Sequence, residues 1–447
     1  MHERTQRAIA RLMFVFCCAI PTSFTVFCIL VTWTPWYHSR TVHRLEQELA
    51  DSTGLVVSLD DVQRTAPGVW QLLGMQLIDP ETNGEVARVR KVEWSLRNNE
   101  ASLLLHQPEL ESRYLAQAWR LIHDRWIIRP QASEKTLTVA CNDLTIHSQF
   151  GSMTLRDVDA WIRPEEKGVE ATIQGLPASS VADAPLQITV RRDRSRERPF
   201  TQWTLQTGDT SLPCSTLAEY VPWMASLGNQ ATFSGTMAWQ SDERQWSMDL
   251  GGSRFENVSL DRFFEKHAHR LSGSADVVLD RCRIDPHERR SDISGSIRVQ
   301  DGAIGRSLLI SAQENLGMQV RLPNHINTAP GDIPFDRIAI GFNINNTQMV
   351  LGGICRNERG FESYPAGVVM LLDGYPIATT NDAVLPALKL LTTIAPSHSV
   401  AVPVSSQTQS MLNIFIPPSR PMPTGQDYPP RIRSARNWDA GPTISQP

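Results

Sequence analysis

The first long feature of the chain is an apolar stretch, LMFVFCCAIPTSFTVFCILVTW at residues 12–33, which contains no charged side chain. A bilayer core about 30 Å thick is crossed by about 20 apolar residues in a helix, so the stretch predicts one transmembrane helix with a kink at Pro21. Trp33, Trp36 and Tyr37 follow, where aromatic side chains favour the headgroup layer. A cleaved signal peptide is the alternative, but its apolar region runs only about 7–15 residues and ends in small residues. An uncleaved single-pass anchor is therefore the favoured interpretation.

Charged residues on either side predict the orientation of this anchor. Arg4, Arg7 and Arg11 precede it, whereas the two arginines just after it are soon offset by two glutamates. Because loops rich in Lys and Arg stay in the cytoplasm, we expect residues 1–11 there and everything after about residue 38 to be exported.

Beyond the anchor, the spacing of apolar residues changes from helical to strand-like. Val42, Leu45 and Leu49 lie three and four residues apart, which predicts a short amphipathic helix over 38–50 that Gly54 ends. Alternating apolar and polar residues, separated by turns rich in Pro and Gly, then predict three strands. These strands cover residues 56–65, 68–80 and 85–96.

A second long helix is predicted over residues 108–127, where Leu115, Trp119 and Trp126 recur at helical spacing and Pro130 prevents continuation. Further along, segments of period two follow each other about every ten residues, with Asp, Asn and Gly in the turns. The strands they predict are 136–148, 151–164, 169–176, 186–193, 201–207, 231–240, 245–260, 271–285, 292–305, 335–346 and 348–356. Short helices are predicted between them at 216–227, 260–268, 306–316 and 385–395.

This order of elements predicts a mainly β protein built on a large antiparallel sheet. Alternation gives each strand one apolar and one polar face, which fits two architectures. One is an elongated, curved, gutter-like sheet with an open apolar face, and the other is a compact packed sandwich. The segment 417–447 is rich in proline and is predicted to be a disordered tail.

Composition narrows the function without naming it. Lys and Arg number 43 against 47 Asp and Glu, for a net charge of −4, and 41% of the residues are hydrophobic. These values exclude a largely disordered chain and argue against a nucleic-acid partner. The basic run at 191–198 alternates with acidic residues and lacks aromatic ones, so we expect a charged hairpin tip there.

No residue pattern predicts catalysis, a metal site or a cofactor. The chain lacks a Gly-x-Ser-x-Gly elbow, a Walker loop and a His-Glu-x-x-His pair. Cys141, Cys214, Cys282 and Cys355 are about 70 residues apart and form no Cys-x-x-Cys motif, which disfavours zinc. Two disulfides in an exported domain and buried free thiols both remain open for these four cysteines.

The twelve tryptophans supply the candidate binding residues. Trp94, Trp203 and Trp239 fall on the apolar face of predicted strands, and Val92 and Leu96 share the face of Trp94. We treat these five residues as candidates for an apolar groove or for a packed core, the more common location of tryptophan.

Two segments give the chain a resemblance to a known family. Residues 53–96 carry a Thr-Gly turn, a strand, a strand ending in an Asp-Pro turn, and a strand of alternating basic and apolar residues. Residues 234–285 carry a Gly-led strand, an Asn-Val-Ser-Leu turn, a short predicted helix and a Leu-Ser-Gly-Ser sequence before the next strand. Together with the preceding membrane span, these segments resemble AsmA-like proteins, which are relatives of TamB.

The resemblance implies a protein of the bacterial inner membrane, with a cytoplasmic N-terminus and the bulk of the chain in the periplasm. The domains it suggests are a cytoplasmic N-terminus (1–11), a transmembrane helix (12–33), an N-terminal AsmA-like β-repeat with flanking helices (38–130), a middle β region (131–230), a C-terminal AsmA-like β region (231–416) and the proline-rich tail (417–447). About 25 strands at roughly 4.8 Å each would give the sheet a reach of about 120 Å at most.

The function that the resemblance implies is not enzymatic. The protein would bind or move phospholipid along an apolar β groove, or support outer-membrane and envelope assembly. Its candidate partners are phospholipid and another envelope protein. No cofactor and no nucleic acid is expected. The alternative is a membrane-tethered structural or scaffold protein with a packed β-sandwich and a partner-binding tail, and an envelope hydrolase on a β fold is a third hypothesis.

Overall fold

The described part of the chain is dominated by one large β-sheet. The computed structural model describes residues 12–394 except for 33–34, 98–99, 115–122, 124–126, 128–135, 149–150, 179–183, 196–198, 209, 219–220, 243–244, 266, 328–329 and 358–362. Within these residues, 23 strands join in a single sheet, so the predicted mainly β fold is confirmed. The strands are β1 (Val56–Ser58), β2 (Asp61–Ala66), β3 (Val69–Ile78), β4 (Glu85–Arg97), β5 (Glu100–Glu111), β6 (Thr136–Ser148), β7 (Gly151–Glu165), β8 (Gly168–Pro177), β9 (Leu186–Asp193), β10 (Phe200–Gln206), β11 (Leu212–Pro213), β12 (Thr232–Ser234), β13 (Thr236–Ser241), β14 (Trp246–Asp249), β15 (Ser253–Ser259), β16 (Ser274–Asp285), β17 (Arg290–Ile304), β18 (Gln319–Val320), β19 (Ile333–Asn345), β20 (Gln348–Gly353), β21 (Val368–Leu372), β22 (Tyr375–Thr379) and β23 (Val384–Pro386).

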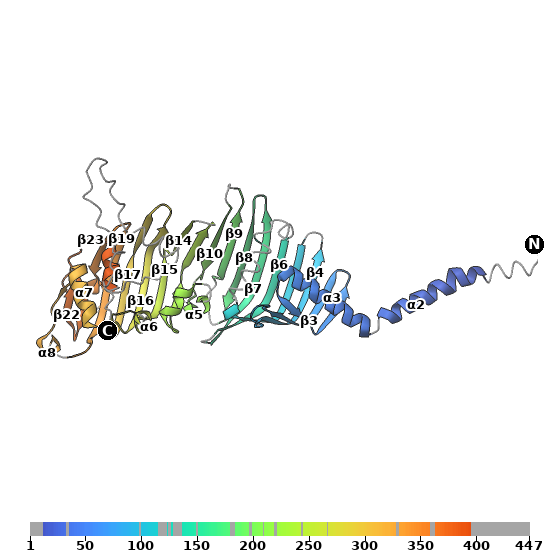
Figure 1. Cartoon of the computed structure of the whole chain (residues 1–447), viewed down its shortest axis with the longest axis horizontal. Coiled ribbons are helices and arrows are strands. Elements are labelled where there is room, and N and C mark those ends of the chain that lie inside the picture. Colours follow the sequence, from blue (N-terminus) through green and yellow to red (C-terminus); the bar gives the residue numbers. More distant parts are fainter. Residues whose placement is uncertain are drawn as a thin grey trace, which may run out of the picture.

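The sheet is elongated because its strands pair in nearly sequential order. Pairing runs from β3 through β4 to β10, continues through β13, β14, β16, β17 and β19, and reaches β20 and β23. Both β1 and β2 pair with β3, at the end nearest the N-terminal helices. Figure 1 shows the strands lying crosswise to the longest axis, with β3 and β4 near one end and β22 and β23 near the other.

One pairing departs from the predicted antiparallel sheet. β5 pairs with β6 in parallel, with Leu103 opposite Val139 and Leu105 opposite Cys141. A parallel pair needs a long crossover connection, which residues 112–135 provide, and the sheet is therefore mixed. The helix predicted over 108–127 is wrong at its start, because residues 108–111 belong to β5 and the helical residues begin at 112.

Short helices connect the strands at several places. Those in the described residues include α5 (Cys214–Leu217), η4 (Pro222–Leu227), α6 (Leu260–Phe264), α7 (Arg306–Leu316), α8 (Asn324–Asn327), η5 (Cys355–Asn357) and α9 (Leu388–Ile394). Side chains of α7, namely Leu308, Leu309, Ala312 and Leu316, are buried in the main hydrophobic core of the sheet. The same core takes in Leu260, the first residue of α6.

The N-terminal helix is long and apolar enough to cross a membrane. The candidate span is Leu12–Leu30, and none of it is buried against the rest of the described chain. It consists of a π-helical turn, η1 (Val15–Ala19), followed by α2 (Ile20–Thr32). The N–H of Ile20 bonds to the carbonyl of Val15, directly before Pro21. Because proline lacks an N–H and crowds the carbonyl four residues earlier, the wider π turn accommodates it.

The amphipathic helix predicted after the anchor is present as α3 (Pro35–Thr53). Gly54 ends it as predicted, with φ +79° and its N–H bonded to the carbonyl of Ala50. Val42, Leu45 and Leu49 face a second hydrophobic cluster with Leu72 and Val92 of the sheet. The predicted apolar stripe of this helix therefore packs on the first strands.

Most predicted element boundaries agree with the structure, and the differences have local causes. β6, β9 and α7 coincide with the predicted ranges 136–148, 186–193 and 306–316. The predicted strands 231–240 and 245–260 are each divided in two, the first at Gly235 and the second around Gly252, both with positive φ. The predicted helices 216–227 and 385–395 are divided into α5 and η4 and into β23 and α9. The segment 1–11, predicted to be cytoplasmic, and the tail 417–447 lie outside the described residues.

Bulges in the long strands keep apolar residues on one side of the sheet. The register shifts between Arg156 and Asp159 in β7, so Leu155 and Val158 are both buried although they are three residues apart. A similar shift in β16 leaves Leu279 and Cys282 both buried. An inserted residue shifts the alternation by one position, which restores the same face after the bulge.

Candidate functional site

The five candidate residues all lie on one face of the sheet. Register pairs connect Leu96 of β4, strand by strand, to Trp203 of β10 and Trp239 of β13. We call the side of the sheet that carries this row the apolar face. The row consists of Leu96, Ala101, Leu137, Ile162, Ala171, Val190, Trp203 and Trp239.

A second row runs beside the first and contains another candidate. Trp94 of β4 is opposite Leu103, and the pairing continues to Leu205 and Met237. Because neighbouring strands lie about 4.8 Å apart, the two rows form a continuous apolar surface across the strands from β4 to β10 and β13. The second row consists of Trp94, Leu103, Val139, Ala160, Ile173, Ile188, Leu205 and Met237.

Exposure differs strongly along the apolar face. Val92 is 1% exposed and belongs to the cluster under α3, so this candidate is a core residue. Leu96 is 46% exposed and Ile173 is 38% exposed, while Trp203 and Trp239 are half-buried. Large apolar side chains thus remain accessible on several strands of the sheet, where burial would be the usual outcome.

Three tryptophans form a stacked group on this face. Trp203 and Trp239 have ring centroids 6.5 Å apart, and Trp239 and Trp246 are parallel with centroids 5.0 Å apart. The indole N–H of Trp246 is buried and has no hydrogen-bond partner among the described residues. The sequence reasoning did not select Trp246, whose place in the group depends on the β13–β14 pairing of Ser241 with Trp246.

The chain itself covers part of the apolar face. Ile127, from the crossover between β5 and β6, is fully buried against Val169, Ala171 and Val190. Its carbonyl accepts a hydrogen bond of 2.6 Å from Arg194. An aliphatic side chain thus occupies the face directly beside Trp203, which packs against the same cluster.

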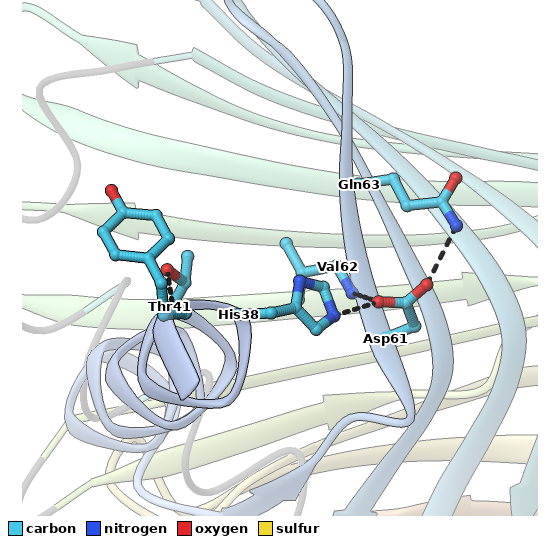
Figure 2. A network of polar contacts seen from close by, with 6 residues as sticks. His38, Thr41, Asp61, Val62 and Gln63 are labelled. Carbon is cyan, nitrogen blue, oxygen red and sulfur yellow. Dashed lines mark hydrogen bonds and ion pairs between the residues drawn. The ribbon is translucent and has the colours of Figure 1, made fainter. Parts of the chain in front are cut away.

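Polar contacts attach α3 to the end of the sheet that holds β1 and β2. His38 Nε2 lies 2.6 Å from Asp61 Oδ1, which also accepts the N–H of Val62 at 2.7 Å, and Gln63 Nε2 donates to Asp61 Oδ2 at 2.8 Å (Figure 2). The hydrogen bond from Gln63 is the main cause that lowers the pKa of Asp61, with Val62 and His38 adding to it. This carboxylate therefore stays ionised and connects the helix to β2.

The opposite, polar face carries a hollow of a different character. Its volume is about 420 Å³, and Arg90, Lys91, His106 and Asp143 line it together with Leu104. Lys91 Nζ and Glu93 Oε1 form an ion pair of 2.7 Å nearby. Charges of both signs are mixed there, as on an ordinary solvated surface, and the hollow adds no apolar site.

The four cysteines outside the anchor are buried free thiols, as one of the two predictions had it. Burial raises the pKa of Cys141 and of Cys282 to about 11 and that of Cys214 to about 12. Burial also raises the pKa of Cys355. Among the described residues no group of three or more His, Cys, Asp or Glu could hold a metal ion.

Comparisons of the chain with protein-family models, with curated proteins and with solved structures gave no match.

Proposed function

We propose that this protein is a membrane-anchored, AsmA-like envelope protein that binds the acyl chains of phospholipid on the apolar face and moves lipid along the sheet. In this proposal, Leu12–Leu30 holds the chain in the bacterial inner membrane, with the N-terminus in the cytoplasm and the sheet in the periplasm. The observation that carries the proposal is the continuous row from Leu96 to Trp239, which stays partly accessible except at Ala171 and Val190.

Physical chemistry favours acyl chains as the occupant. Burying apolar area is favourable by about 25 cal/mol per Å², so an uncovered apolar surface of several strands attracts a long hydrocarbon chain. The chain segment already on this face presents an aliphatic side chain, Ile127, to the cluster of Val169 and Val190. The amphipathic helix α3 leads from the candidate membrane span to the first strands. In the proposal, one end of the apolar face therefore lies next to the membrane.

The scaffold alternative is less favoured by the described residues. A packed β-sandwich covers the apolar faces of its strands, whereas Leu96 and Ile173 keep 46% and 38% of their surface exposed. The strands also follow each other in one sheet from β3 to β23, without a second sheet in the described part of the chain. The partner-binding tail of that alternative lies outside these residues.

A photo-crosslinking experiment tests lipid binding directly. The photoreactive residue p-benzoylphenylalanine replaces Ile173 in the full-length protein, expressed in bacterial membranes labelled with ³²P-phosphate. Leu104 provides a matched control because it is 37% exposed, against 38% for Ile173, but lies on the polar face opposite Glu93. We expect irradiation to attach labelled phospholipid at position 173 and not at position 104. Equal labelling at both positions, or none at position 173, would contradict the proposal.

A further inference from the structure

Strand β9 places two consecutive arginines on opposite faces of the sheet. Arg191 faces the polar side, where its Nη2 lies 3.1 Å from Glu165 Oε2. Arg192 faces the apolar side, since it alternates with Val190 and is paired with Val169 and Thr201 on the neighbouring strands. Arg192 is half-buried. A charged side chain on an otherwise apolar face is unusual and requires an explanation.

The polar partner of Arg192 is neutral. Its Nη1 donates a 2.8 Å hydrogen bond to the hydroxyl of Thr201, which is itself buried. No carboxylate lies within ion-pair distance of Arg192 among the described residues, in contrast to Arg191. Placing a cation in apolar surroundings is costly in free energy unless an anion neutralises it.

A second cation strengthens the positive potential at the same place. Arg194 follows two residues later, and its pKa is lowered by burial first and by the charge of Arg192 second. Its Nη2 donates to the carbonyl of Ile127. Two guanidinium groups therefore lie close enough to repel each other at the edge of the apolar face, which attracts an anion.

The surroundings of the two arginines show which anion would fit. Directly beside Arg192 lie Val169 and Val190, which are 0% and 3% exposed, and the next residue along the first apolar row is Trp203. The Ile127 contact already combines an aliphatic group buried on Val169 with a carbonyl oxygen on Arg194. An anionic amphiphile carries the same two kinds of group, an aliphatic chain and oxygen atoms that accept hydrogen bonds from a guanidinium.

We propose that Arg192 binds the anionic headgroup of an amphiphile whose hydrocarbon chain lies along Trp203 and Trp239. The inference rests on the proposed function and adds a headgroup site to it. A guanidinium donates two parallel hydrogen bonds to a phosphate or a carboxylate, and both are head chemistries of anionic amphiphiles. The experiment below distinguishes a phosphate head from a carboxylate head.

The test uses the full chain in phosphatidylcholine nanodiscs that contain a small amount of one diazirine-labelled probe. The probes are phosphatidic acid, a fatty acid and the uncharged diacylglycerol, and crosslinks in β9, β10 and β13 are measured by mass spectrometry. We expect the wild type to prefer the anionic probes to diacylglycerol by about tenfold, the size of one charge-assisted hydrogen bond. The stronger of the two anionic probes then identifies the head as phosphate or carboxylate.

Comparing substitutions at Arg192 and Arg191 tests whether Arg192 causes the preference for anionic probes. R192Q should remove the anionic preference and leave the diacylglycerol yield unchanged, R192K should retain part of it, and R191Q should behave as wild type because Arg191 faces Glu165. Thermal unfolding shows whether each variant is folded. If R192Q is not folded, R192K is compared with the wild type instead. An anionic preference that R192Q does not reduce would overturn the inference. Equal yields of anionic and uncharged probes would also overturn it while leaving the proposed function intact, whereas no crosslink with any probe would contradict the proposed function itself.

Discussion

At the residue scale, the four buried cysteines show how burial determines chemical behaviour. Cys141 and Cys282 lie in the core with a pKa raised to about 11, mainly by burial, against an ordinary value of 9.0. Only the thiolate is a good nucleophile, so a thiol with a raised pKa reacts slowly at neutral pH. The alternation of their strands could have predicted burial from the sequence, but only the structure decides against a disulfide.

These thiols lead to a prediction about pH. The pKa of Cys141 and of Cys282 is higher in the folded protein than in the unfolded chain. Their neutral thiols therefore contribute fully to the free energy of unfolding below pH 9, and this contribution is lost as the pH rises toward about 11. We expect the free energy of unfolding to fall in that window, and alkylation of the four cysteines at pH 8 to require denaturant. Iodoacetamide labelling followed by mass spectrometry, with and without urea, measures the second effect. Rapid labelling of Cys141 or Cys282 in the native protein would contradict it.

A glycine in β17 gives a second prediction at this scale. A Cβ added to Gly295 would lie 2.0 Å from the carbonyl oxygen of Val278, and the ring of Phe342 covers the position on the paired strand. Gly295→Ala should therefore force the strands apart and destabilise the protein by about 1–3 kcal/mol. Gly341→Ala is the control, since its nearest contact is a side-chain methyl of Ile354 at 3.1 Å. Urea unfolding compares the two, and equal stability would show that the sheet tolerates the added methyl group.

At the scale of single elements, the helix α3 is held by an apolar stripe and by two carboxylates. Asp61 accepts hydrogen bonds from Val62 and Gln63 and contacts His38 of α3, and Glu46 of the same helix accepts the N–H of Leu59 at 2.9 Å. These contacts fix the helix against β1 and β2. They join residues far apart in the sequence, which explains why spacing predicted the helix but not its docking.

Removing the Asp61 carboxylate should loosen α3. Asp61→Ala leaves the donors of Val62, Gln63 and His38 without this acceptor, and we expect a loss of about 1–2 kcal/mol and faster amide hydrogen exchange in α3. The pKa of Asp61 is lowered in the folded protein. The wild type should therefore keep the hydrogen bonds of the Asp61 carboxylate at a pH above 3.8, the ordinary pKa of an aspartate, and lose them as the pH falls through the lower pKa of the folded state. Arg44→Ala removes only an exposed pair with Glu48 and should change exchange little. Equal exchange in both variants would contradict a docking role for Asp61.

Elements that the sequence pattern missed share a physical cause. β21 has the sequence VVMLL and is buried at every position, so it shows no alternation. β5 carries Leu103, Leu104 and Leu105 in succession and contains Pro108, and both features hide its period of two. Without β5 the parallel pairing with β6 could not be predicted, and the register from Leu96 to Trp203 depends on that pairing. Sequence reasoning thus placed candidates on the correct face of each strand but could not align them in a row.

At the scale of the whole molecule, the geometry of the sheet determines how long the proposed lipid path can be. Some pairs of short strands lie end to end beside one long strand and so add only one strand width to the sheet. β1 and β2 both pair with β3, and β20 and β21 both pair with β19. The reach is therefore shorter than the roughly 120 Å expected for 25 strands in series. If lipid crosses a wider compartment, the distal end of the sheet near β23 must pass it to another carrier.

Movement along the sheet, as distinct from binding, makes the last prediction. Ile173 on β8 lies between Leu96 on β4 and Met248 on β14 along the apolar face. A carboxylate at position 173 meets an acyl chain without a partner, which costs a few kcal/mol and should block passage. In Ile173→Glu, a photoreactive residue at position 96 should still capture phospholipid, while one at position 248 should lose most of its label. Leu104→Glu, on the polar face, should leave both positions labelled. Retention of label at position 248 in Ile173→Glu would show that lipid reaches the distal strands by another route, and that the apolar face binds lipid without conducting it from the membrane end.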